Sequence, residues 1–386
     1  MNRTHYRLLT ELLAQPTAPF REGHVVRFVT QVLERAHVPH FLDPIGNIVV
    51  GCADARAYRR RLRTAREPLR LFIAHMDHPG FHGVRWRAPD RLTIRWHGGS
   101  PVKHLIGSRV WLADAEGYVG HGRLHDVRLH PAGHSIATAD VLLGRGTHAA
   151  ARPAAALYGG FAFRAPVWHA GRRLYTKAAD DLVGVYAVLR TALDVFRARR
   201  GADRPFLGLL TRAEEVGFVG AIGHFELGWL THKDPVVCVS LETSRTLPNA
   251  LVGRGPVVRL GDRRTVFDPG GTHLMSELAR TTLPDRHQRR IMDGGTCEAT
   301  AAIAYGLRAI GLSIPLGNYH NQGFEGGPDC RKSHGPAPEF VHLDDIDGLT
   351  ALCRASVDTG LAWDRPWDAQ QRLFRKRFRG QRALLR

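Results

Sequence analysis

Three continuous apolar runs, each of strand length, constrain the fold more than any other feature of the sequence. They are LRLFIAH (Leu69–His75), PFLGLL (Pro205–Leu210) and PVVCVSLETS (Pro235–Ser244). Runs without polar alternation are typical of strands buried on both faces, as in a sheet that helices cover. Apolar residues recur with helical spacing in other segments, for example from Gly23 to Ala36. We therefore predict an α/β fold whose central sheet is mixed, mostly parallel and flanked by helices on both faces.

The pattern changes between residues 84 and 166, where short strand-like pieces such as LTIRWHGG and YVGHGRL are separated by turns. No long helical period occurs there, so we predict a small all-β, barrel-like domain inserted into the α/β domain. The predicted division is 1–83 for the first part of the α/β domain, 84–166 for the inserted domain, 167–370 for the second part and 371–386 for a basic C-terminal tail.

The composition limits the classes of partner. The net charge of +18 invites a nucleic-acid interpretation, but the arginines are spread along the chain, and the dense cluster is the tail RLFRKRFRGQRALLR (Arg372–Arg386). No helix-turn-helix, zinc-finger or RNP signature supports a nucleic-acid partner. No apolar run reaches 18 residues and the N-terminus lacks a signal-peptide core, so we expect no membrane partner and a cytoplasmic protein. Five scattered cysteines without a CxxC pair indicate neither a disulfide framework nor a cysteine-based zinc site.

Candidate ligands follow the predicted strands at the point where each strand ends. They are His75, Asp180, Glu214 with Glu215, Glu242 and His320. Because the carboxyl ends of parallel strands meet in one crevice, we expect these side chains to converge. Two histidines and three carboxylates suit a pair of zinc-like ions that share one carboxylate, and the sixth residue is then free to act as a general base. Asp77 stands two residues after His75 and could accept the other ring N–H of that histidine.

Several motifs, taken in order, resemble one family. The chain is similar to the co-catalytic metallo-aminopeptidases of the tetrahedral (TET) or glutamyl/leucyl aminopeptidase type, within the zinc exopeptidase clan. The resemblance covers most of the chain, from about Leu8 to about Leu361. The segments that carry it are AHMDHPGF (Ala74–Phe81), HGGSPVKHLIGSRV (His97–Val110), KAADDLVG (Lys177–Gly184), TRAEEVGFVGA (Thr211–Ala221), GGTCEATAAIAYG (Gly294–Gly306) and IPLGNYHN (Ile314–Asn321).

The resemblance implies an aminopeptidase that removes N-terminal residues from peptides by means of a water activated at a dinuclear metal centre. Two divalent ions are implied, with zinc as the first choice and cobalt or manganese as alternatives. A homo-oligomer built through the inserted β domain is also implied, a dodecameric tetrahedron being one such assembly. The implied roles are His75, Asp180 and Glu242 for one metal, Asp180 as bridge with Glu215 and His320 for the other, Glu214 as general base and Asp77 as the residue that orients His75.

The sequence departs from the family pattern at several of these motifs. His78 stands where the family often has Glu, Leu182 where it has Arg, and Glu242 where it has Asp, while Cys297 and then Glu298 follow the GGT turn. His334, in SHGPAPE, competes with His320 as the last ligand; we prefer His320 because of its spacing from the preceding proline.

Two alternative functions stay open at this point. One is a deacylase or dipeptidase of the same fold that acts on another amide. The other is a catalytically inactive scaffold whose basic tail binds RNA.

Overall fold

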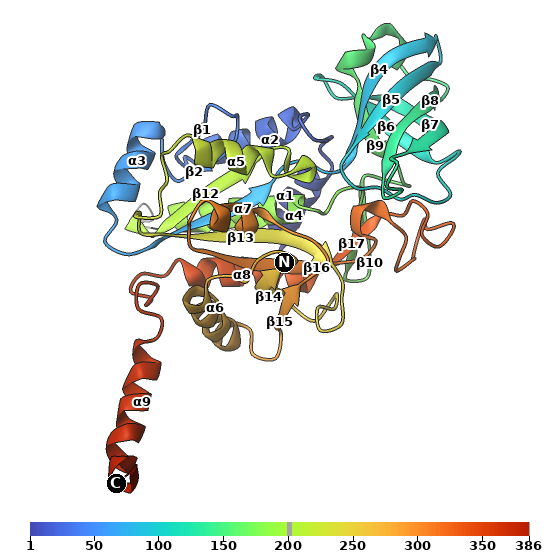
Figure 1. Cartoon of the computed structure of the whole chain (residues 1–386). Helices are drawn as coiled ribbons and strands as arrows, with labels where there is room; N and C mark the ends of the chain where they lie inside the picture. Colours follow the sequence, from blue (N-terminus) through green and yellow to red (C-terminus); the bar gives the residue numbers. More distant parts are fainter. Residues whose placement is uncertain (199–202, 386) are drawn as a thin grey trace.

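The computed structural model describes residues 1–198 and 203–385. Its centre is an eight-stranded mixed sheet (Figure 1). The strand order is β1 (His40–Leu42), β2 (Ile48–Val50), β12 (Phe206–Thr211), β3 (Leu69–His75), β13 (Val236–Arg245), β16 (Ala309–Leu316), β14 (Val257–Asp262), β15 (Gln288–Met292). The four central strands β12, β3, β13 and β16 run parallel, whereas β1, β2 and the β14–β16 pairing are antiparallel.

The apolar runs form central strands because both faces of the sheet are covered. In β3, Phe72 and Ala74 belong to one hydrophobic core, whereas Leu71 and Ile73, which point the other way, belong to a second core. Helices that contribute to the first core are α1 (Arg3–Leu13), α2 (Gly23–Arg35), α4 (Leu182–Arg197), α6 (Pro269–Thr282) and α8 (Leu343–Ser356). Those of the second are α3 (Ala55–Thr64), α5 (Val219–Glu226) and α7 (Glu298–Ala304). The predicted mixed α/β sheet with helices on both faces is confirmed.

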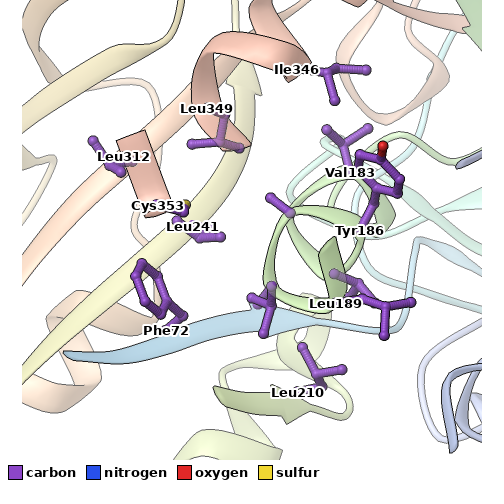
Figure 2. Packing of buried hydrophobic residues seen from close by; sticks show 14 of the residues in the cluster. Phe72, Val183, Tyr186, Leu189, Leu210, Leu241, Leu312, Ile346, Leu349 and Cys353 are labelled. Atoms are coloured by element: carbon purple, nitrogen blue, oxygen red, sulfur yellow. The ribbon is translucent and has the colours of Figure 1, made fainter. Parts of the chain in front are cut away.

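The first core is centred on helix α4, which packs on the same face of the sheet as its neighbour α8. Figure 2 shows side chains of the sheet, such as Phe72 and Leu241, facing Val183 and Leu189 of α4 and Leu349 of α8. These side chains are buried, and each stabilises the fold by about 1.5–3 kcal/mol relative to an exposed position. This packing holds the first turn of α4, which begins two residues after Asp180, against the sheet.

A closed antiparallel barrel lies at one end of the molecule, beyond the edge of the sheet layers (Figure 1). It has its own core, which includes Phe81, Ile94, Leu124 and Phe161. Two 3-10 turns, η1 (Ala149–Ala151) and η2 (Ala154–Ala156), precede its last strand. The strands, in barrel order, are β4 (Gly80–Ala88), β5 (Arg91–His97), β8 (Ile136–Leu143), β7 (Tyr118–Leu129), β6 (Arg109–Ala113) and β9 (Tyr158–Phe161). The division of the chain into independent domains stays a prediction.

Two further elements complete the structure. A three-stranded antiparallel sheet joins β10 (Val167–Ala170), β11 (Arg173–Thr176) and β17 (Glu339–His342). Helix α9 (Asp368–Gln381), with the 3-10 turn η6 (Arg382–Leu385), projects away from the body (Figure 1). Among the described residues, no helix is both long enough and apolar enough to cross a membrane.

Candidate metal centre

The predicted ligands come together at the carboxyl edge of the sheet. His75 is the last residue of β3, and in the next strand Thr211 pairs with it and ends β12. The 3-10 turn η4 (Glu214–Val216) follows β12 after Ala213, whose left-handed backbone turns the chain back over the sheet edge. Glu242 lies in β13, and Asp180 precedes α4. His320 lies in η5 (Tyr319–Asn321), which follows β16. Parallel neighbouring strands therefore deliver ligands from distant parts of the sequence to one crevice.

Asp180 lies between the two histidines. One carboxylate oxygen, Oδ1, is 3.5 Å from Nε2 of His75, and the other, Oδ2, is 3.5 Å from Nε2 of His320. Nε2 of His320 is also 3.2 Å from Oε2 of Glu215. Within the described residues, three groups have ligand atoms that all lie within 4.8 Å of one another: His75 with Asp180 and Glu242, Asp180 with Glu215 and His320, and His75 with Glu214 and Glu215. The first two groups share only Asp180.

The electrostatics of the cluster favour a bound cation. Burial raises the pKa of Glu214 well above its usual value, and the neighbouring carboxylates of Glu242 and Glu215 raise it further, although His75 acts in the opposite direction. Burial also raises the pKa of Glu242, and the charge of Asp180 adds to the shift. Buried carboxylates this close together repel one another unless positive charge compensates them. The negative charge of these buried carboxylates is therefore not fully compensated by the neighbouring side chains, and divalent cations would compensate it.

Unpartnered polar atoms support the same conclusion. Oδ1 of Asp180, Oε1 of Glu215 and Nε2 of His320 are buried and have no hydrogen-bond partner within the described part of the chain. Such atoms are costly in a protein interior, and they are the nitrogen and oxygen donors that bind zinc-like ions. Burial lowers the pKa of His320, but the carboxylates of Glu215 and Asp180 outweigh burial and raise this pKa to about 10. The residues present thus fit divalent metal ions.

Asp77 fixes the position of the two adjacent glutamates. Its carboxylate accepts the backbone N–H groups of Glu214 and Glu215 at 3.0 and 3.2 Å. Nδ1 of His75 is 3.2 Å from the backbone oxygen of Asp77 and 3.5 Å from its carboxylate. Asp77 therefore connects the turn after β12 to the end of β3, and the nearer acceptor for the ring is the main chain.

Glu339 is a supporting residue that sequence reasoning missed. It is fully buried, and its Oε2 accepts the backbone N–H groups of Ala179 and Asp180 at 2.7 and 3.2 Å, while Oε1 accepts that of His320 at 2.8 Å. Burial and the charge of Asp180 raise the pKa of Glu339, whereas the backbone N–H groups that its carboxylate accepts and the nearby His320 act in the opposite direction. The sequence signal for Glu339 is the motif SHGPAPE, which by itself indicates only an alternative position, His334, for the last histidine ligand.

The departures from the family pattern have definite places in the structure. His78 is buried, and its Nδ1 lies 2.7 Å from the backbone oxygen of Asp180, so it supports the loop that carries this residue. Leu182 lies in the first core. Glu298 is buried and accepts a hydrogen bond from the Thr211 hydroxyl. His334 is exposed and belongs to none of the candidate metal groups found among the described residues.

The barrel also contributes to the wall of the centre. The segment that follows β5 brings Gly99 against His320, so closely that a Cβ at Gly99 would lie 2.1 Å from Nδ1 of that ring. A Cβ at Gly98 would lie 3.3 Å from Cβ of Glu215. The glycine pair in HGGS therefore allows a close approach of main chain to two of the candidate ligands.

Known peptidase structures share this fold. The TET1 peptidase of Pyrococcus horikoshii matches with a TM-score of 0.69 at 18% identity, over 92% of this chain and 99% of that chain. An aminopeptidase from the archaeon Desulfurococcus kamchatkensis matches with a TM-score of 0.70 at 19% identity, over 93% and 96%. An M18-family aminopeptidase from Thermotoga maritima matches with a TM-score of 0.64 at 12% identity, over 92% and 96%. No curated protein matches the chain in sequence. The fold is thus that of the zinc exopeptidase class, as predicted.

Sequence comparison defines the family within this class. The model of the M42 glutamyl aminopeptidases matches residues 59–324, and the chain belongs to this family. It is therefore a peptidase that acts as an exopeptidase, and the predicted resemblance is confirmed. The family indicates a divalent-metal-dependent enzyme, in agreement with the histidine and carboxylate groups at the sheet edge.

Proposed function

We propose that this protein is an aminopeptidase that removes N-terminal residues from peptides with the help of two divalent metal ions and a glutamate base. One observation carries the proposal: Asp180 directs one oxygen to each of two histidines, and each half of this arrangement is completed by a further buried glutamate. A carboxylate with two oxygens can serve two ions at once.

The residues that would hold the ions divide into two sets with a common member. His75 and Glu242 would hold one ion with Asp180, and Glu215 and His320 would hold the other with the same aspartate. Nitrogen and oxygen donors of this kind suit zinc, while cobalt and manganese are alternatives. When bound, the ions would polarise the scissile carbonyl and lower the pKa of water at the site.

Glu214 is proposed as the general base. It is buried beside His75, with its Oε2 3.8 Å from Nε2 of that histidine, and its backbone N–H is held by Asp77. From this position the carboxylate would take a proton from the attacking water and later donate it to the leaving amine. A free substrate N-terminus held near the two ions would make the enzyme an exopeptidase.

The test is a Glu214→Gln variant, with the exposed Glu34→Gln as a matched control. Glu214→Gln is expected to retain the metal content of the wild type while turnover of aminoacyl-nitroanilides falls by about 10²–10⁴-fold, because general-base help is lost. Full activity in this variant would refute the role of Glu214. A wild-type protein that binds metal but leaves a whole panel of nitroanilides intact would instead favour a deacylase.

A homo-oligomer built through the barrel is proposed on the likeness to the TET1 peptidase of Pyrococcus horikoshii, which assembles into a tetrahedron or an octahedral shell. The barrel exposes Ile106, whose side chain is 74% accessible. An Ile106→Asp variant is expected to lower the assembled mass in analytical ultracentrifugation. Val266→Asp, at a 76% accessible position outside the barrel, is the control. An unchanged assembly in both variants would count against Ile106 as an interface residue.

A further inference from the structure

The C-terminal helix α9 stands apart from the body of the molecule (Figure 1). None of its described residues is buried. Its root is fixed, because the Trp367 ring stacks on His273 of α6 with ring centroids 4.6 Å apart. The helix is therefore held at one end and free of the rest of the structure along its length.

From Arg372 to Arg382, α9 and the turn that follows carry charge of one sign only. Six cationic side chains occur from residue 372 to residue 382, and no acidic side chain occurs among them. Within the described ranges, none of these six forms an ion pair. The six are Arg372, Arg375, Lys376, Arg377, Arg379 and Arg382.

Apolar and cationic residues occupy different sides of the helix. At about 100° per residue, Phe374 and Phe378 of α9 lie about 40° apart, and Leu373 lies about 100° from Phe374 on its other side, with Arg377 between them. Both phenylalanines are exposed, at 54% and 60%. The other four cations of α9, Arg372, Arg375, Lys376 and Arg379, fall in an arc of about 100° that faces away from the phenylalanines. The helix is thus amphipathic, with its apolar side turned to solvent.

Such a helix is poorly stabilised without a partner. A helix of 14 residues is marginal in water when no tertiary packing supports it. Like charges three and four positions apart, such as Arg372 with Lys376 and Arg375 with Arg379, repel one another and weaken it further. An anionic surface that accepts apolar side chains would supply the missing packing and would also reduce the repulsion between the cationic side chains.

We propose that α9 docks on an anionic lipid surface, with its phenylalanines at the headgroup boundary and its cations on the headgroups. Arginine and lysine on one side and aromatic and aliphatic residues on the other are the features of helices that lie in a membrane interface. A second copy of α9 is disfavoured as the occupant, because two strongly cationic helices would repel each other. The sequence-based expectation of no membrane partner depends on the absence of a membrane-spanning segment. A helix that lies on the membrane surface does not require such a segment.

The test is co-sedimentation of the full-length protein with vesicles. The protein is expected to bind vesicles of phosphatidylcholine that contain about one third phosphatidylserine, and to bind pure phosphatidylcholine far more weakly. The double variant Phe374→Ser, Phe378→Ser is expected to lose at least about tenfold in partitioning, because two large apolar side chains no longer insert. Peptidase turnover should stay at the wild-type level in this variant, since α9 has no contact with the metal centre.

A matched pair of charge variants separates docking by α9 from general attraction to a basic protein. Arg375→Gln, Lys376→Gln and Arg379→Gln together are expected to lower binding about fivefold per charge removed. Removal of three exposed cations from α3, as Arg56→Gln, Arg60→Gln and Arg63→Gln, is expected to have little effect. Equal losses in the two triple variants would overturn the proposal, as would failure to bind the anionic vesicles. Binding of single-stranded RNA that depends on α9, without binding of vesicles, would assign the helix to nucleic acid instead.

Discussion

Replacement of Glu339 by glutamine provides a sharp test of how the metal centre is held together. The carboxylate accepts three buried backbone N–H groups, from Ala179, Asp180 and His320, and so connects the loop before α4 to the turn after β16. Glutamine has the same shape, but it offers one acceptor oxygen where the carboxylate offers two. Its amide group must therefore face one of the N–H donors.

The cost can be worked from these contacts. If the amide oxygen of the Glu339→Gln variant faces Ala179 and Asp180, the N–H of His320 loses its acceptor. A buried unsatisfied donor costs about 1–3 kcal/mol. The two remaining bonds lose the contribution of a charged acceptor, about 1 kcal/mol each. The total of about 3–5 kcal/mol will appear as a lower free energy of unfolding, as displacement of His320, or as both.

Two measurements follow from this estimate. Urea unfolding of the metal-free variant is expected to show the loss of stability, and a metal titration should show an affinity lower by about 10–100-fold, as for other residues that hold metal ligands in place. Glu325→Gln is the matched control, since Glu325 also accepts a backbone N–H, that of Asn318, but is exposed. A Glu339→Gln variant with wild-type stability and wild-type metal affinity would refute the reasoning.

Three further perturbations have definite expected outcomes. Gly99→Ala should lower the metal content measured by elemental analysis, because the new Cβ would clash with the His320 ring. Gly294→Ala is the control and should keep the wild-type metal content, because a Cβ at Gly294 would have no atom within 4 Å. Phe72→Ala should lower the free energy of unfolding by about 3–5 kcal/mol in a urea titration, because it leaves a cavity in a fully buried core. Burial lowers the pKa of His82 to about 4, below its usual 6.5. The unfolded chain therefore binds a proton that the folded chain excludes, so stability should fall as the pH drops from about 6.5 toward 4, and His82→Gln should reduce this slope in urea midpoints measured across that range.

The central sheet could be predicted because its strands carry a strong physical signal. Phe72 and Leu71 are both apolar because each packs into a different core. A strand that is apolar on both faces is typical of a sheet covered on both sides. The ligands could be predicted for a related reason, because parallel strands bring their carboxyl ends together whatever their separation in sequence. The sequence alone therefore predicts that His75 and Glu242 lie near each other.

The supporting contacts could not be predicted in the same way. Glu339 holds three main-chain groups that come from two separate loops, and no spacing rule connects it with Ala179. The role of Gly99 likewise depends on how closely the barrel approaches His320, which is a matter of tertiary packing. Helix α9 shows a third limit, because its sequence reveals the basic cluster, whereas the absence of buried residues in the described helix appears only in three dimensions.

The close approach of Gly99 to His320 means that the barrel forms part of the wall of the candidate metal centre. An engineered version of the chain that skips from β3 to β10 would keep every proposed metal ligand, yet it would open the wall beside one of the two histidines to water. Substitutions made in the barrel should therefore be assayed for metal binding as well as for stability, because the main chain at Gly99 lies directly against this ring.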